Sequence, residues 1–124
     1  MSTTLESFFE RVRAGQPVEF GETMDLISRF YVYTPARFVN GLGEDALTNE
    51  PGQNEGSCKI FSLAHRHGLV EQETLALFGQ YYRIDVLEHP DARDHQNIRN
   101  FMRYGWPGIR FETEALRPRE TGAP

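Results

Sequence analysis

Two polar side chains fall where the sequence predicts apolar helix faces, and both are of types that support acid–base chemistry or metal binding. Asp85 lies in the apolar stripe of a helix predicted over residues 72–87, seven residues after Phe78. A carboxylate there needs a partner or a cleft, because burying an unpaired charge is costly. His95 lies on the apolar side of a helix predicted over residues 95–104, in the first turn, where the helix dipole favours the neutral imidazole. A neutral imidazole can act as a base or as a metal ligand.

Each of these side chains also has a structural interpretation. Asp85 can form an ion pair or cap a neighbouring helix, and His95 can be a core imidazole that hydrogen-bonds to the backbone or to Asp85. Carboxylate and imidazole groups together suit several divalent metals. Glu55, Asp85 and His95 are therefore the candidate metal ligands, although no ligand-spacing motif accompanies them. The sequence leaves open whether these residues form a site or a structural network.

Cys58 and two arginines complete the set of residues considered for chemistry. Cys58 is the single cysteine and lies in the first turn of a helix predicted over residues 55–67. Free amides at a helix start can lower a thiol pKa, whereas Glu55 nearby opposes the thiolate. A lone cysteine is more often a small buried hydrophobe. Arg83 or Arg99 would be available to bind an anion in a shared cleft. The candidate site cluster is Glu55, Cys58, Arg83, Asp85 and His95.

The elements that must position these residues follow from apolar spacing and from caps. Helices are predicted over residues 4–14, 22–31, 55–67, 72–87 and 95–104. Asn54 is the expected N-cap of the third of these helices, and Asp94 or Asp91 that of the last. Short strands are predicted at residues 37–41 and 109–112, free to pair with each other, with a long surface loop over residues 42–53. These elements predict a single small α+β domain, rich in helix and with a small β-sheet.

Composition and charge narrow the class of protein. The chain has 124 residues, which is a common size for one domain, and 39% of them are hydrophobic. The net charge is −5 and the basic residues are dispersed, so binding to nucleic acid is not expected. One cysteine allows no internal disulfide, and no apolar stretch approaches a membrane span or a secretory signal. Residues 117–124 are polar and predicted to form a flexible C-terminal tail after a domain over residues 1–116.

Four sequence segments, in order, resemble the HopJ type III effector family of small bacterial proteins. They are YTPARFVNG at 33–41, NEGSCKIF at 54–61, TLALFGQYYR at 74–83 with Asp85, and DHQNIRNFM at 94–102 with Trp106. The resemblance implies a bacterial protein without an assigned reaction, cofactor or catalytic residue set. The family motif residues that match are Asn54, Glu55, Cys58, Arg83, Asp85, Asp94, His95 and Trp106. The expected location is the bacterial cytoplasm, or a host cell if the protein is a translocated effector.

The sequence supports three functional hypotheses. The first is a binding or interaction module for a protein partner, which predicts an exposed apolar surface. The alternative is a small enzyme, or a ligand- or metal-binding protein, with a cleft around Glu55, Asp85 and His95. The third is a purely structural network at the same residues. Whether the protein is an enzyme, which ligand it binds and how it oligomerises are left open.

Overall fold

Helices form where apolar residues recur three and four positions apart. The computed structural model describes residues 4–119. Its helices are α1 (Leu5–Arg13), α2 (Phe20–Phe30), α3 (Glu55–Arg66), α4 (Glu71–Ala76), a π-helix (Tyr81–Val86) and α5 (Gln96–Tyr104), with short 3-10 turns at Gly43–Asp45 and Trp106–Gly108. No helix among the described residues is long and apolar enough to cross a membrane.

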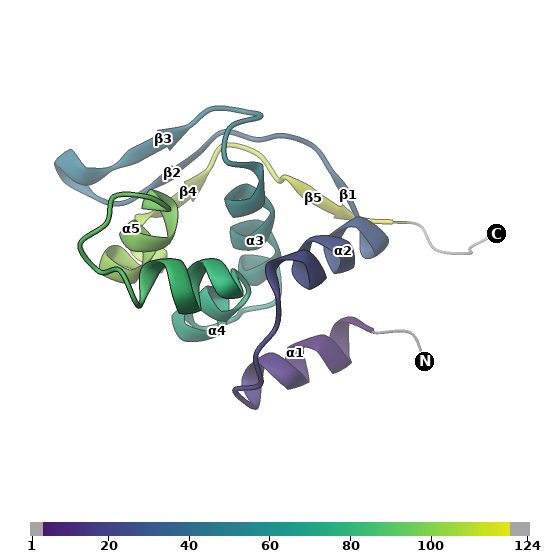
Figure 1. The fold of residues 1–124 in the computed structure, drawn as a ribbon. Coiled ribbons are helices and arrows are strands. Elements are labelled where there is room, and N and C mark those ends of the chain that lie inside the picture. Colours follow the sequence, from purple (N-terminus) through teal and green to yellow (C-terminus); the bar gives the residue numbers. More distant parts are fainter. Residues whose placement is uncertain (1–3, 120–124) are drawn as a thin grey trace.

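Five strands of three residues each form two small antiparallel sheets. One contains β2 (Phe38–Asn40) between β3 (Leu47–Asn49) and β4 (Ile109–Phe111), and the other pairs β1 (Tyr31–Tyr33) with β5 (Leu116–Pro118). Figure 1 shows the strands along one side of the molecule, α1 at the opposite side and α3 between them. The predicted pairing of the two strands near residues 38 and 110 is confirmed, and so is the α+β fold class.

The core is built around α3, whose inward face is apolar along its whole length. Ile60, Phe61 and Leu63 are completely buried. The Phe61 ring contacts those of Phe38 from β2 and Phe101 from α5, with ring centroids 5.9 and 4.9 Å apart. One aromatic side chain of α3 therefore joins the sheet to the helix that directly follows the candidate histidine.

The helix predicted over residues 72–87 is broken at Gly79, so that prediction was wrong. α4 ends at Ala76, and the chain turns at Gly79 with a φ of +61° before the π-helix starts. A Cβ at residue 79 would lie only 2.4 Å from the backbone nitrogen of Phe20. Glycine is therefore the one residue that fits at this position. Asp85 is therefore not on the apolar stripe of a continuous helix. It lies half-exposed in a separate π-turn.

The C-terminal boundary also differs from the expectation. Arg117 and Pro118, which the sequence assigned to a flexible tail, belong to β5 and pair with β1. The amide of Arg119 donates a hydrogen bond to the carbonyl of Phe30, 3.0 Å away. The predicted start of the tail is therefore too early, and its last five positions, 120–124, lie outside the described residues.

Candidate functional site

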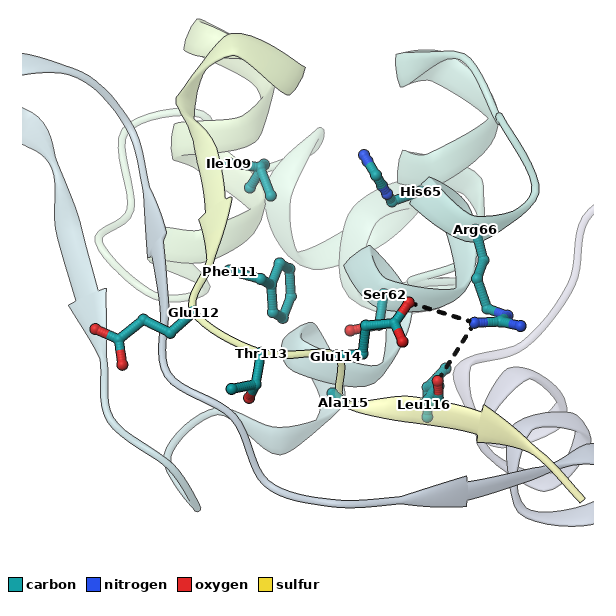
Figure 2. A pocket seen from close by; sticks show the side chains of 10 residues that line it. All are labelled: Ser62, His65, Arg66, Ile109, Phe111, Glu112, Thr113, Glu114, Ala115 and Leu116. Carbon is teal, nitrogen blue, oxygen red and sulfur yellow. Dashed lines mark hydrogen bonds and ion pairs between the residues drawn. The ribbon is translucent and has the colours of Figure 1, made fainter.

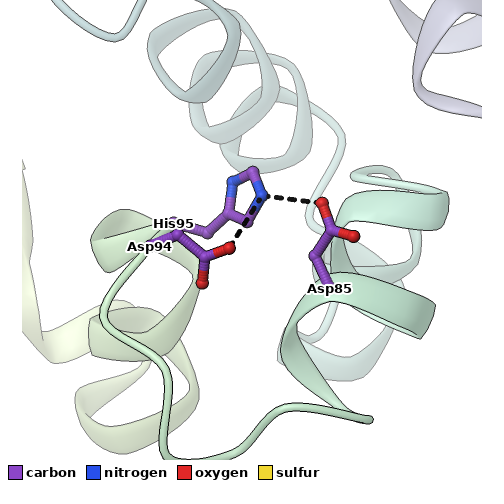
Figure 3. A group of neighbouring side chains, drawn as sticks. All are labelled: Asp85, Asp94 and His95. Carbon is purple, nitrogen blue, oxygen red and sulfur yellow. Dashed lines mark hydrogen bonds and ion pairs between the residues drawn. The ribbon is translucent and has the colours of Figure 1, made fainter.

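The structure brings Asp85 and His95 together from two separate elements. His95 Nε2 lies 3.0 Å from Asp85 Oδ2 and 3.8 Å from Asp94 Oδ2. Ligand atoms of Asp85, Asp94 and His95 all lie within 4.8 Å of one another. Figure 3 shows both carboxylates facing the same imidazole nitrogen, while the other ring nitrogen points away from them. Carboxylate oxygen and imidazole nitrogen are both atom types that bind divalent cations in proteins.

Local backbone geometry sets the position of each member of this group. Asp85 lies in the π-helix. This conformation is rare in proteins, and where it does occur it is often at a functional site. His95, not Asp94 or Asp91 as predicted, is the N-cap residue of α5, and its φ of 52° is left-handed. The His95 ring stacks on Tyr81, with centroids 5.1 Å apart and an interplanar angle of 27°. This contact holds the imidazole toward the two carboxylates.

The charge state of Asp94 suits a cation ligand. A hydrogen bond from Arg99 holds the pKa of the Asp94 carboxyl below its ordinary value. Asp94 is therefore ionised at neutral pH. The sequence had placed this residue only as a helix cap and a family motif position. Its adjacency to His95 was the available signal for a role as a ligand.

A cavity of about 400 Å³ adjoins the same histidine. The first turns of α3 and α5 border this cavity, and the aromatic side chains of Phe20 and Tyr81 form part of its wall. Asn54 and His95, which precede these two helices, are the non-glycine residues with positive φ among residues 4–119. Neither helix start receives a hydrogen bond from the side chain of its N-cap residue. Strained backbone of this kind concentrates at functional sites, and here both instances border one cavity.

Glu55 and Cys58, predicted to join the cluster, lie elsewhere. Glu55 is exposed at the start of α3 and is not part of the group of potential metal ligands found in residues 4–119. Cys58 is 1% exposed, and its thiol lies 3.7 Å from the carbonyl oxygen of Ala36. Burial raises the pKa of this thiol, while the hydrogen bond to Ala36 opposes that effect. Cys58 is thus a buried neutral thiol, apart from the Asp85–His95 pair.

Arg83 is engaged in holding two elements together. Its guanidinium lies 2.8 Å from Glu19 Oε1 and donates a hydrogen bond to the carbonyl of Val18, at 2.6 Å. These bonds fix the π-helix to the residues before α2. In the group with Asp85 and His95, the third member is Asp94, whereas the sequence had predicted Glu55.

A second cavity, of about 350 Å³, lies between α3 and the segment that connects β4 to β5. Figure 2 shows Arg66 at its edge, between Glu114 and the backbone of Leu116. The guanidinium lies 3.8 Å from Glu114 Oε1 and 3.5 Å from the Leu116 carbonyl oxygen. Arg66 thus pairs with Glu114 at this cavity, and the other lining carboxylate, Glu112, pairs with Arg37.

Comparisons with known proteins support the resemblance seen in the sequence. The chain matches the family model described as HopJ type III effector protein over residues 5–116. It is similar to a crystal structure of "unknown function protein VPA0580", with 46% sequence identity and a TM-score of 0.88. That similarity covers 96% of this chain and 97% of the other. No curated protein matches the chain.

Proposed function

This chain belongs to the HopJ type III effector protein family, and from its side-chain geometry we propose that it binds a divalent cation through Asp85, Asp94 and His95. The observation that carries the proposal is the convergence of three ligand atoms, from the π-helix and from the start of α5, within 4.8 Å. Three protein ligands leave coordination positions open for water or for a bound molecule. The cavity lined by His95 supports a role in ligand binding or metal-assisted chemistry.

The test is the metal content and metal affinity of the purified protein. We expect near-stoichiometric binding of Zn²⁺ or Mn²⁺, measured by mass spectrometry and by calorimetric titration without chelator. Asp85→Asn and His95→Gln each remove one ligand and are expected to abolish that binding while the chain stays folded. Circular dichroism checks the fold of each variant.

Matched controls lie in the segment between the π-helix and α5. Asp91 and His89 are exposed residues of the same types, outside the ligand group. Asp91→Asn and His89→Gln are therefore expected to bind metal as the unchanged protein does. Absence of metal binding in the unchanged protein, or equal binding in Asp85→Asn, rejects the proposed centre.

Binding of a protein partner is a second candidate function, favoured by exposed apolar side chains beside the centre. Ile84, Leu87 and Met102 are 48%, 49% and 45% exposed. Leu87 and Met102 also line a shallow cavity with Pro90. Exposed apolar residues that gather in this way are typical of interaction sites. If the protein is exported as an effector, such a partner would be a protein of the host cell.

Site-specific photo-crosslinking inside cells tests this second function. A crosslinker at position 102 is expected to form a discrete adduct that Leu87→Asp removes, because the change places a charge within the apolar surface. The same crosslinker at exposed Glu44 is the control. Equal labelling from positions 102 and 44 would reject a specific partner at this surface.

A further inference from the structure

Arg99 connects both carboxylate-bearing segments of the proposed centre. Its Nε donates a hydrogen bond to the Asp94 carbonyl at 2.6 Å, and its Nη2 donates to Asp94 Oδ1 at 2.7 Å. The same guanidinium reaches the carbonyl oxygens of Pro90 and Asp85 at 3.3 and 3.4 Å. The Arg99 side chain is only 14% exposed. One largely buried guanidinium therefore holds the backbone on both sides of the candidate ligands.

These bonds give the two oxygens of the Asp94 carboxylate different partners. Oδ1 accepts the hydrogen bond from Arg99, while Oδ2 lies on the side of the His95 imidazole. A carboxylate held in this way offers one oxygen to a cation. The adjacent guanidinium also cancels one of the two negative charges next to the imidazole nitrogen.

Divalent cations differ in what they require of such a set. Ca²⁺ takes six to eight oxygen ligands, with carboxylates that are often bidentate. Zn²⁺ is bound by few ligands, and imidazole nitrogen is among those it prefers. A centre with one imidazole and a carboxylate restricted to one oxygen matches the second type of ion.

We propose that Arg99 is a positioning residue that makes the Asp85–Asp94–His95 centre selective for Zn²⁺-like transition metals over Ca²⁺. This inference rests on the proposed function. Arg99 acts through Asp94: it fixes the carboxylate as a one-oxygen ligand, orients Oδ2 toward His95 and lowers the net negative charge. Residues that orient metal ligands in this way commonly change metal affinity by about 10- to 100-fold when they are replaced.

The test is a comparison of Zn²⁺ and Ca²⁺ affinities, each metal titrated alone by calorimetry. The unchanged protein is expected to bind Zn²⁺ more tightly than Ca²⁺. Arg99→Gln is expected to weaken Zn²⁺ binding by about 10- to 100-fold. Its Ca²⁺ affinity is expected to stay the same or rise, because both oxygens of Asp94 and one more negative charge become available. Arg103→Gln, one turn later on α5, is the matched control and is expected to keep the unchanged ratio.

Arg99→Lys serves as a second variant in case the glutamine variant does not fold. A lysine keeps the charge and lacks the planar fork, so the Zn²⁺ to Ca²⁺ affinity ratio is expected to fall in this variant as well. An unchanged ratio in either folded variant overturns the selectivity role of Arg99 and leaves the metal centre intact. Absence of metal binding in the unchanged protein overturns the proposed function itself, so the two failures are distinguishable.

Discussion

At the scale of single residues, burial determines the chemistry of Cys58 more than its place at the start of α3. A helix start lowers a thiol pKa where the sulfur faces the free amides and solvent. Cys58 is instead buried next to the carbonyl of Ala36, and desolvation raises its pKa. We therefore expect a chromogenic disulfide reagent to modify the native protein far more slowly than the urea-unfolded chain at mildly alkaline pH. Equal rates in the two states would instead identify an accessible thiolate.

A second prediction at this scale concerns His67, which lies 2.6 Å from the Tyr31 hydroxyl. Burial lowers the pKa of His67 from the ordinary value of 6.5, and Arg66 and Arg13 add to the effect. The unfolded chain therefore takes up a proton first as the pH falls. The contribution of His67 to stability is present above about pH 6.5 and declines as the pH falls through the lower folded-state pKa.

Urea unfolding at about pH 7.5 and pH 5 measures this contribution. The free energy of unfolding is expected to fall less between the two pH values in His67→Gln than in the unchanged protein. His89→Gln, at an exposed histidine, is expected to keep the full decrease. A decrease of the same size in His67→Gln would contradict the assignment.

At the scale of elements, Gly79 sets the break between α4 and the π-helix. Its left-handed φ and its close approach to Phe20 both exclude a side chain. Gly79→Ala is expected to lower the free energy of unfolding by more than the ~1–2 kcal/mol that a left-handed residue costs by itself. Gly68 has a φ of +65° with open space around it, so Gly68→Ala is expected to cost only that amount. Chemical denaturation of both variants measures the difference, and equal losses would contradict the packing argument.

The sequence predicts the helices well where apolar periodicity is strong, and less well where three-dimensional contacts decide. Residues 72–87 carry helical periodicity throughout, and only the approach of the Val18–Phe20 backbone to Gly79 interrupts it. Strands β1, β3 and β5 were not predicted, although they are as short as the predicted strands β2 and β4. Their partners lie in distant segments, so pairing and not local pattern defines them.

The candidate site is predicted from the sequence in part. The periodicity that singled out Asp85 assumed an unbroken helix, whereas the contact with His95 depends on the π-turn. Asp94 precedes the N-cap residue His95, and its carboxylate lies 3.8 Å from the His95 imidazole. Glu55 and Cys58 lie in the same sequence segment as residues that line the cavity, yet their side chains lie elsewhere. Side-chain direction at a helix start is a tertiary property that one sequence does not reveal.

At the scale of the whole molecule, buried asparagines connect the sheet to α5. Asn97 Oδ1 accepts hydrogen bonds from Asn40 of β2 at 3.0 Å and from Asn49 of β3 at 3.3 Å. Asn97 Nδ2 donates to Asn49 Oδ1 at 2.9 Å, and Asn54 donates to the same oxygen at 2.7 Å. The network thus reaches both helix starts that border the cavity.

Removing the central amide tests how much this network contributes. Asn97→Ala is expected to lower the free energy of unfolding by about 1–3 kcal/mol, because buried amides of Asn40 and Asn49 lose partners. Gln96→Ala, at the exposed neighbouring position, is expected to cost less than about 0.5 kcal/mol. Thermal or urea unfolding compares the two variants, and an equal small effect would mean that the network adds no net stability.

The β1–β5 pair has a consequence for the order of folding. Tyr31 lies opposite Pro118, so this small sheet closes a loop that contains most of the described chain. Closing so long a loop in an unfolded chain costs much entropy for three residue pairs, whereas the cost is small once the intervening helices have compacted. The pair is therefore a late event, and contacts of such large sequence separation slow folding. During synthesis, β1 leaves the ribosome long before β5, and both of its edges stay unpaired until β5 has been made.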